Sequence, residues 1–228
     1  MDDIRKTNQI VGVLSDKDGD KVIKLYNTLA QRYMILRTYK QAVQAYEQVK
    51  YVKHPNLPEV YDTVNGVHGQ TVFEEFIEGM TVAEVLETGK YTYRGMKKVL
   101  CGICSAVSYL HSQGVVHRDI KPENVMVNKV GQVKLIDLNA ARLFDLNKCK
   151  DTQVLGTIGY ASPEQLGIGQ TDTRTDIYAL GVLINVMLTG EHPSKKLAKG
   201  KAGRIVLKCT QIDPNSRFQT VEKLMQAL

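Results

Sequence analysis

The chain has 228 residues, of which 43% are hydrophobic and 24% are charged, and this is typical of a folded globular protein. A chain of this length can bury a sizeable core as one large domain or as two lobes. The formal charge of +6 is mild: it would suit a polyanionic nucleotide, a solvated basic surface explains it equally well, and we expect no nucleic-acid partner.

The sequence predicts neither a secretory signal nor a membrane span. Residues 1–6 open with charge and lack an apolar core region. The most apolar run, residues 177–188, is too short to cross a bilayer and contains Asn185, so we interpret it as a buried helix. We therefore expect a cytoplasmic protein with no membrane partner.

The first eighty residues predict a small antiparallel sheet with one helix. Residues 9–14 and 21–26 are strand-like, and an Asp-Gly turn joins them. Residues 29–52 are interpreted as one long helix, which Pro55 ends. Two further strands are predicted at residues 59–64 and 70–74.

Beyond Gly79 the pattern becomes mainly helical. The predicted elements are helices at residues 82–86 and 93–112, a strand hairpin at 125–127 and 133–135, and helices from about residue 176 onward. Cys101 and Cys104 form a C-x-x-C, which could indicate zinc or redox chemistry, but they fall inside the helical pattern and are predicted to be reduced core thiols. The basic stretch from Lys195 to Arg204 is either a solvated loop or a docking surface for an acidic partner.

One charged segment lies between two apolar runs and predicts a functional loop. It reads His117-Arg118-Asp119-Ile120-Lys121-Pro122-Glu123-Asn124. A charged surface turn is the alternative, but that alternative predicts nothing further along the chain. Four more segments follow in a fixed order: Leu135-Ile136-Asp137-Leu138-Asn139, Gly156-Thr157 with Pro163-Glu164, Asp176-Ile177-Tyr178-Ala179-Leu180-Gly181, and Arg217.

These segments resemble the H-R-D-x-K-x-x-N, D-F-G, A-P-E and D-x-W-x-x-G motifs and the late arginine of the eukaryotic-like protein kinases. The resemblance extends from about Gln9 to the C-terminus, is densest in the last hundred residues, and is greatest to compact bacterial serine/threonine kinases. It implies an α+β, bilobal fold. Residues 1–79 would form a lobe with a small antiparallel β-sheet and an αC helix, and residues 80–228 a larger, mainly helical lobe.

The resemblance implies a site for ATP and Mg²⁺. Asp119 would orient the attacking hydroxyl and accept its proton, and Lys121 would stabilise the transferring phosphoryl group. Asn124 and Asp137 would be the magnesium ligands.

Five residues would contact the nucleotide itself. Lys24, in a Val22-Ile23-Lys24 segment that resembles V-A-I-K, would bind the phosphates; an exposed strand lysine is the alternative. Val22 and Met126 would form the roof and floor of the adenine pocket. Glu75 and Ile77 would bind adenine through their backbone groups.

The N-terminal region departs from the family pattern in two ways. The αC glutamate position falls on Ala45, and Glu47 would reach the strand lysine only if the helix register slips. No G-x-G-x-x-G precedes the second strand, so the first strand and the glycine-rich loop are expected to be absent and nucleotide affinity weak. The strand between Ile10 and Val13 would then be an exposed edge, which a partner strand could cover.

Several side chains outside these sets have expected roles. Thr152 is the candidate activating phosphosite, because its phosphate could pair with Arg118. Thr157 is expected to form hydrogen bonds near Asp119 and Lys121. Glu164 and Arg217 are expected to form a buried ion pair. Asn139, in place of the motif's glycine, is expected to tolerate a positive φ, and Glu74 falls at the back of the pocket unless it is a strand residue that faces solvent.

The leading hypothesis is an ATP-dependent serine/threonine protein kinase whose partner is a protein substrate with a serine or threonine. The alternative is a pseudokinase that acts as a nucleotide-binding or protein-interaction module. A small-molecule kinase on the same fold is less favoured, because residues 157–164 resemble a peptide-binding activation segment.

Overall fold

The computed structural model describes residues 7–17, 19–67, 69–144, 157, 159–167 and 170–228. The chain divides into two compact units. The first contains residues 1–54 and 58–78, and the second contains residues 55–57 and 79–228. The first unit is built on an antiparallel sheet and the second is mainly helical, in agreement with the predicted α+β class.

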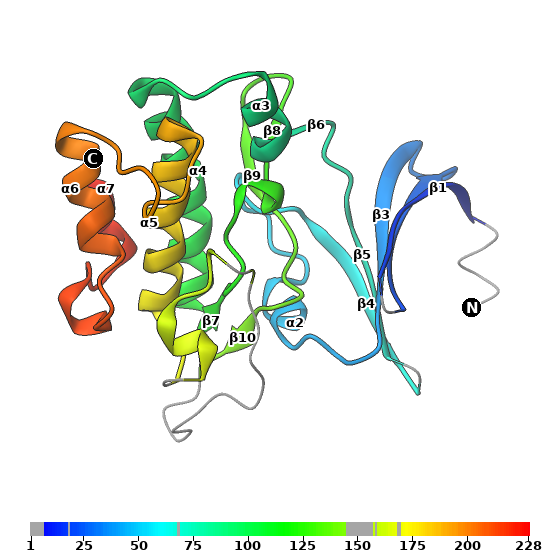
Figure 1. Ribbon diagram of the computed structural model, residues 1–228. Helices are drawn as coiled ribbons and strands as arrows, with labels where there is room; N and C mark the ends of the chain where they lie inside the picture. The colour runs from blue at the N-terminus through cyan, green and yellow to red at the C-terminus, as the bar shows by residue number, and fades with distance from the viewer. Residues whose placement is uncertain (1–6, 18, 68, 145–156, 158, 168–169) are drawn as a thin grey trace. The chain divides into compact units, whose positions relative to one another are not determined.

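The first unit contains a five-stranded antiparallel sheet in the order β1-β2-β3-β5-β4 and the short helix α2 (Figure 1). Its elements are β1 (Asn8–Lys17), β2 (Asp20–Asn27), β3 (Arg32–Tyr39), α2 (Ala45–Val49), β4 (Val60–Gly66) and β5 (Gly69–Glu75). The two hairpins predicted from the sequence are confirmed. β1 pairs with β2 up to Lys17 and Asp20, and β4 pairs with β5 up to Gly66 and Gly69.

The helix predicted over residues 29–52 is confirmed only at Ala45–Val49, where α2 lies, and is wrong over the rest of that range. Residues 32–39 form β3, which pairs with β2 on one side and with β5 on the other. The segment contains leucine, methionine and arginine, which favour a helix when they are considered alone. A central strand between two partners satisfies the backbone on both edges, and this tertiary context overrides the local preference.

The presence of β3 also corrects the expected loss of a strand. A third strand now follows the β1–β2 hairpin, so the hairpin occupies the place where the family has its first strand and glycine-rich loop. Within the described residues the turn from β2 to β3 is stabilised by Asn27, whose Oδ1 accepts a hydrogen bond from the Ala30 N–H at 2.7 Å. Gln31, with a φ of 50°, completes this turn.

The apolar face of the first sheet has a core of three buried residues, Leu25, Met34 and Phe73. They come from β2, β3 and β5, so this cluster joins the three central strands. The helix α2 is only five residues long, and it buries Ala45, Tyr46 and Val49. The Tyr46 and Tyr39 hydroxyls share a hydrogen bond of 2.8 Å, which connects the helix to the end of β3.

The second unit is organised around two long helices, α4 (Tyr93–Ser112) and α5 (Thr173–Thr189), which pack against each other (Figure 1). α4 begins where the Thr92 hydroxyl accepts a hydrogen bond from the Gly95 N–H. α5 begins with the Asp172 carboxylate in the same role and ends at Gly190, which has a φ of 77°. The remaining helices of this unit are α3 (Val82–Thr88), α6 (Gly200–Cys209), α7 (Val221–Ala227) and the 3₁₀ turns η1 (Pro122–Asn124), η2 (Pro163–Leu166) and η3 (Pro214–Ser216).

Short strands of the second unit lie beside its functional loop. β8 (Val125–Asn128) pairs with β6 (Gly79–Thr81) and with β9 (Val133–Leu135), and β7 (Val115–Val116) pairs with β10 (Arg142–Leu143). A Cβ on Gly79 would lie 2.3 Å from the Val127 carbonyl oxygen, so the close β6–β8 pairing requires glycine there. The predicted hairpin at residues 125–135 is therefore confirmed.

The cysteines of α4 behave as helix-face thiols. Cys104 is fully buried, Cys101 is half-buried, and both are free. Burial raises the pKa of the Cys104 thiol well above its ordinary value, which makes it unreactive. Among the described residues, no helix combines the length and the apolar character that a bilayer crossing needs.

Candidate active site

Asp119, Lys121, Asn124 and Thr157 form one hydrogen-bonded cluster in the second unit. The loop that carries the first three residues lies between β7 and β8, so strands fix it at both ends. Lys121 Nζ lies 2.7 Å from Asp119 Oδ2, and Asn124 Nδ2 donates to the same oxygen at 2.9 Å. The Asp119 carboxylate therefore accepts bonds from two neighbours of its own loop.

Thr157 joins the cluster from a segment almost forty residues further on. Its hydroxyl donates to Asp119 Oδ1 at 2.7 Å and accepts from Lys121 Nζ at 2.7 Å. The role expected for Thr157 is thereby confirmed. Burial disfavours the charged form of Asp119, but the bonds from Lys121 and Thr157 and the charge of Lys121 outweigh burial, so the pKa of this carboxyl is lowered.

A backbone hydrogen bond brings the segments of Asn124 and Asp137, two residues with side-chain oxygen atoms, next to each other. The Ile136 N–H donates to the Asn124 carbonyl oxygen at 2.9 Å, which places the residue before Asp137 next to the loop. Because Asn124 Nδ2 is bonded to Asp119, its Oδ1 is the atom suited to a hard cation. No group of three or more His, Cys, Asp and Glu side chains gathers as a metal site within the described parts of the chain. Magnesium is commonly held by only one or two carboxylates together with phosphate oxygens, so this donor set fits it.

Two residues of the site have strained backbones. Arg118 has a φ of 64° and Asp137 has a φ of 66°, which side chains with a Cβ rarely adopt. Asn139 was expected to tolerate a positive φ, but in the structure the positive φ is that of Asp137. Asp137 Oδ1 accepts the Asn139 N–H at 3.1 Å, so the local turn is closed by a side chain.

A buried carboxylate from α5 holds the backbone of the loop. Asp176 is fully buried, and its two oxygens accept the N–H groups of His117 at 2.9 Å and Arg118 at 2.8 Å. Burial disfavours its charge, but a 2.8 Å bond from His111 Nε2 and the backbone donors lower the pKa of this carboxyl. The sequence located Asp176 only as a helix start, and its role as the anchor of the loop emerges from the structure.

Arg118 is enclosed in the second unit. Its Nε donates to the Ala140 carbonyl oxygen at 2.7 Å, and burial together with repulsion from Arg142 lowers the pKa of its guanidinium to about 10. A cationic pair at this point would attract an anion. Thr152, the predicted phosphosite, lies outside the described residues.

The predicted pair of Glu164 and Arg217 is confirmed. Arg217 donates from Nη1 and Nη2 to the two carboxylate oxygens of Glu164 at 2.7 and 2.8 Å, a bidentate arrangement. Arg217 is 2% exposed and Glu164 7%. Burial disfavours the charged carboxylate, but the bonds from Arg217 outweigh burial and lower the pKa of Glu164.

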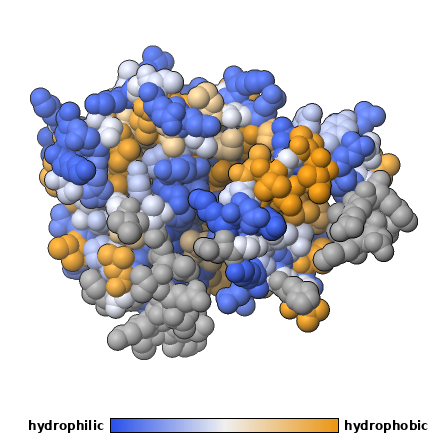
Figure 2. All heavy atoms as spheres, turned by 45° about the vertical axis from the view of Figure 1, so that its right-hand side comes forward, coloured by the Kyte–Doolittle hydropathy of each residue, from blue (hydrophilic) through white to orange (hydrophobic). Residues whose placement is uncertain are grey.

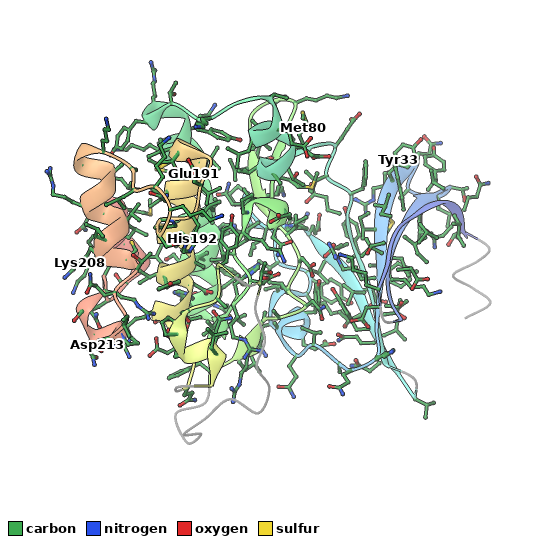
Figure 3. The ribbon with its side chains drawn as sticks, in the orientation of Figure 1. Tyr33, Met80, Glu191, His192, Lys208 and Asp213 are labelled. Atoms are coloured by element: carbon green, nitrogen blue, oxygen red, sulfur yellow. The ribbon has the colours of Figure 1, made fainter. Side chains whose placement is uncertain are left out.

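The nucleotide contacts predicted in the first unit lie on β2 and at or just after the end of β5, the two strands that flank β3. Val22 and Lys24 are on the same face of β2, Glu75 ends β5, and Ile77 is buried just after β5. Lys24 Nζ lies 4.2 Å from the ring centre of Tyr33 (labelled in Figure 3) and 4.0 Å from that of Phe76. In the second unit, Met126 is on β8, opposite Thr81 and Lys134.

The structure places Arg37 where the family has its strand lysine. In protein kinases that lysine ends the V-A-I-K segment of the third strand. Lys24 is on the second strand, and on the third strand the corresponding segment is Met34-Ile35-Leu36-Arg37. The Lys24 prediction assumed that a helix follows β2 directly, and β3 removes that assumption.

Arg37 forms a buried ion pair with Glu74 of β5. The Arg37 Nε lies 2.6 Å from Glu74 Oε1, and the side chains are 8% and 4% exposed. Glu74 is therefore not the solvent-facing strand residue that was one of its two interpretations. On α2, Ala45 is buried, and Glu47 accepts a 2.7 Å bond from the Thr63 hydroxyl.

The tip of the β1–β2 hairpin lies at the sequence positions that the glycine-rich loop occupies in the family. Counted back from Val22, the three glycines of G-x-G-x-x-G-x-V correspond to Ser15, Lys17 and Asp20. Asp16 and Lys21, paired across the hairpin, form a salt bridge of 3.0 Å. The loop that was expected to be missing therefore has residues, but none of its three glycines.

Comparison with known proteins agrees with this geometry. A family profile described as "Protein kinase domain" matches residues 10–227. The chain belongs to this family. The kinase domain is 32% identical over 178 residues to the probable serine/threonine-protein kinase PknB of Bifidobacterium longum, an alignment that covers 72% of this chain and 25% of that protein. It is 31% identical over 196 residues to the serine/threonine-protein kinase PrkC of Bacillus subtilis, covering 75% of this chain and 30% of PrkC. The kinase domain thus spans about a quarter to a third of the length of these two relatives.

The sequence analysis did not predict the ion pair between Arg37 and Glu74. One local signal was present, because Tyr33 to Leu36 is an unbroken apolar run that a buried strand would also produce. The pairing itself joins residues 37 positions apart, and no short motif announces it.

Proposed function

We propose that this kinase domain binds ATP with magnesium and transfers the γ-phosphoryl group to a serine or threonine hydroxyl of a protein. The observation that carries the proposal is the cluster of Asp119, Lys121, Asn124 and Thr157, joined by hydrogen bonds of 2.7–2.9 Å. Phosphoryl transfer depends on positioning and on charge neutralisation more than on covalent chemistry, and this cluster supplies groups for both.

Asp119 orients the attacking hydroxyl and accepts its proton. Its lowered pKa keeps the carboxylate ionised at neutral pH, as a group that is to accept a proton must be. Lys121 carries the positive charge that stabilises the phosphoryl group during transfer. Its present partners, Asp119 and Thr157, hold the ammonium beside the carboxylate until the phosphate arrives.

Asn124 and Asp137 hold magnesium through Oδ1 and the carboxylate. When bound, magnesium neutralises the charge of the phosphate oxygens. The 2.9 Å bond between the Ile136 N–H and the Asn124 carbonyl oxygen, together with the turn at Asp137, fixes the position of Asp137 relative to Asn124. The nucleotide also contacts Val22, Met126 and the backbone of Glu75 and Ile77 around its adenine.

Arg37 binds the phosphates in place of the strand lysine. A guanidinium is always charged and matches the geometry of phosphate oxygens. Lys24, with its ammonium over two aromatic rings, contacts the segment around Phe76. Because Ser15, Lys17 and Asp20 replace the loop glycines, fewer backbone N–H groups can approach the phosphates, and we expect weak affinity for ATP.

The protein substrate binds along the segment from Thr157 to Glu164. The two relatives named above are serine/threonine kinases by name, and a lysine two residues after Asp119 accords with that class. We place the domain in the cytoplasm, where its co-substrate ATP is available.

Incubation with γ-labelled ATP, magnesium and a generic basic protein tests the proposal. We expect label on serine or threonine with the parent, at least a hundredfold less with Asp119→Asn, and none when EDTA removes magnesium. Equal labelling by parent and Asp119→Asn would contradict the proposal. No labelling by either, with ATP still raising the melting temperature, would instead identify the pseudokinase alternative.

We also propose that the free edge of β1 can accept a partner strand. β1 is an edge strand of its sheet, and it exposes Ile10, Val11, Val13 and Leu14 at 51–71%. An apolar patch is visible on the face shown in Figure 2. Ile10→Lys with Val13→Lys should abolish any concentration-dependent self-association in light scattering without lowering the melting temperature, and association that persists in this variant would contradict the proposal.

A further inference from the structure

Arg37, the proposed phosphate-binding cation, is paired with an acid of the sheet, Glu74 of β5. Kinases pair their third-strand cation with a glutamate of the αC helix, and both must be in place for transfer. The helix α2 offers Ala45 at that position, with 1% of its surface exposed. The acid of α2, Glu47, is bonded to Thr63 of β4.

Strand pairing brings Glu74 to Arg37. In the antiparallel β3–β5 register Arg37 is opposite Val72, and Glu74 is two residues further along on the same face. Such diagonal neighbours are within reach of long side chains. The result is the 2.6 Å contact between Arg37 Nε and Glu74 Oε1.

The pair faces the side of the sheet that would meet the nucleotide. Val22, the proposed roof of the adenine pocket, is directly opposite Arg37 in the β2–β3 register, so both side chains project from one face. A guanidinium has five N–H donors in a fixed planar fork, and the bond from Nε to Glu74 sets the plane of that fork. Glu74 can therefore orient Arg37 toward an anion on this face.

A purely structural explanation fits the pair less well. Two buried charges are costly to desolvate, and apolar residues of similar volume are often at least as stable at such sites. The neighbours Ile35 and Val72 already give this face apolar packing. A charged pair at this place is better explained by the need for a fixed cation.

We propose that Glu74 is the positioning residue of Arg37 and replaces the αC glutamate. The inference rests on the proposed function. It also has a regulatory consequence: both partners are on paired central strands, so a shift of α2 would not break the pair. The domain would keep its phosphate-binding cation in place without the helix movement that switches other kinases.

Three variants test the inference. Glu74→Gln keeps the shape but removes the charge, and Arg37→Met with Glu74→Met removes both charges together so that neither is left buried alone. Glu47→Gln is the matched control, an acid of the same unit outside the pair. Each variant is compared with the parent in kcat and KM for ATP per folded molecule, and in the rise of melting temperature caused by magnesium-ATP.

We expect Glu74→Gln to lower kcat/KM about tenfold, mainly through kcat, because a misplaced guanidinium harms the transition state more than the ground state. The double variant should fold, lose at least a hundredfold in kcat/KM and lose most of the rise in melting temperature. Glu47→Gln should stay within about twofold. A fall in melting temperature with unchanged kinetics in Glu74→Gln and the double variant would mean that the pair is only structural and would overturn the inference.

The outcome is separable from that of the proposed function. If the parent transfers no phosphate, the magnesium-ATP rise in melting temperature still decides: its loss in the double variant supports the inference, and an equal rise overturns it. If the parent shows no rise either, no nucleotide is being positioned and the inference is overturned. If the parent is active and the double variant is equally active, the inference is overturned while the proposed function stands.

Discussion

The kinase domain holds two ion pairs in different ways. Asp119 and Lys121 of the second unit belong to one loop, and their side chains are 16% and 19% exposed. Arg37 and Glu74 of the first unit come from two central strands and are 8% and 4% exposed. A pair that solvent reaches is cheap to separate, whereas breaking a buried pair leaves an uncompensated charge.

Under the proposed function, the first pair must rearrange and the second must not. Lys121 would turn from Asp119 to an incoming phosphate while Thr157 stays bonded to Asp119. Arg37 would bind the nucleotide while it keeps its bond to Glu74. The predictions below change one side of the comparison at a time.

The largest effect is expected from the second unit when a magnesium ligand is removed. Asp137→Ala should lower transfer on the order of a thousandfold, because a bound metal supplies several kcal/mol of charge stabilisation. The rise in melting temperature that ATP produces with magnesium should also be lost, whereas the smaller rise with ATP and EDTA should stay. A magnesium-dependent rise equal to that of the parent would exclude Asp137 as a ligand.

The next largest effect is the loss of stability on breaking the buried Glu164–Arg217 pair of the second unit. Arg217→Met should lower the free energy of unfolding by about 3–5 kcal/mol at pH 7, measured by urea denaturation, because Glu164 is left buried without its guanidinium. Arg217→Met with Glu164→Gln should recover part of the loss. A loss below about 1 kcal/mol would show that burial does not separate the two kinds of pair in this molecule.

The same variant predicts a pH dependence. The pKa of Glu164 is lowered in the folded protein, so its contribution is complete above the ordinary value of 4.5 and disappears as the pH falls through the folded value. The difference in unfolding free energy between parent and Arg217→Met should therefore be fully present at pH 7 and shrink as the pH falls below 4.5. A difference that stays constant over this range would contradict the assigned cause of the shift.

The smallest effect concerns the half-buried pair of Asp119 and Lys121. Thr157→Val keeps the shape of the side chain but removes the hydrogen bond to Asp119, which favours the ionised carboxylate. The pKa of Asp119 should rise, so the acid limb of the pH profile of kcat/KM should move upward by about one pH unit. An acid limb that does not move would show that Thr157 has no influence on the proton acceptor.

Local motifs predicted the second unit well. The loop from His117 to Asn124 is contiguous, so its residue types and spacing already specify the cluster, and the structure adds only Asp176 as its anchor. The helix at residues 93–112 has a clear 3.6-residue period and coincides with α4. The Glu164–Arg217 pair was predictable through the family pattern alone, because the two residues are 53 positions apart.

The first unit was predicted only in part. Its hairpins follow from alternation and turn residues, whereas β3 contains helix formers and is a strand because β2 and β5 flank it. The phosphate-binding cation is located by counting strands. Without β3 the count leads to Lys24, whereas with β3 it leads to Arg37, the residue that we propose. The partner acid could not be predicted at all, since it depends on the β3–β5 register.

The most direct measurement compares the two candidate cations. It determines kcat/KM for magnesium-ATP, per folded molecule, in Lys24→Met and in Arg37→Met with Glu74→Met. A lysine over two aromatic rings at a partly exposed site contributes only about 0.5–1 kcal/mol, so Lys24→Met should remain within about threefold to fivefold of the parent. The double variant should lose at least a hundredfold. The reverse order, with Lys24→Met the inactive variant, would contradict the assignment of the phosphate-binding cation to β3.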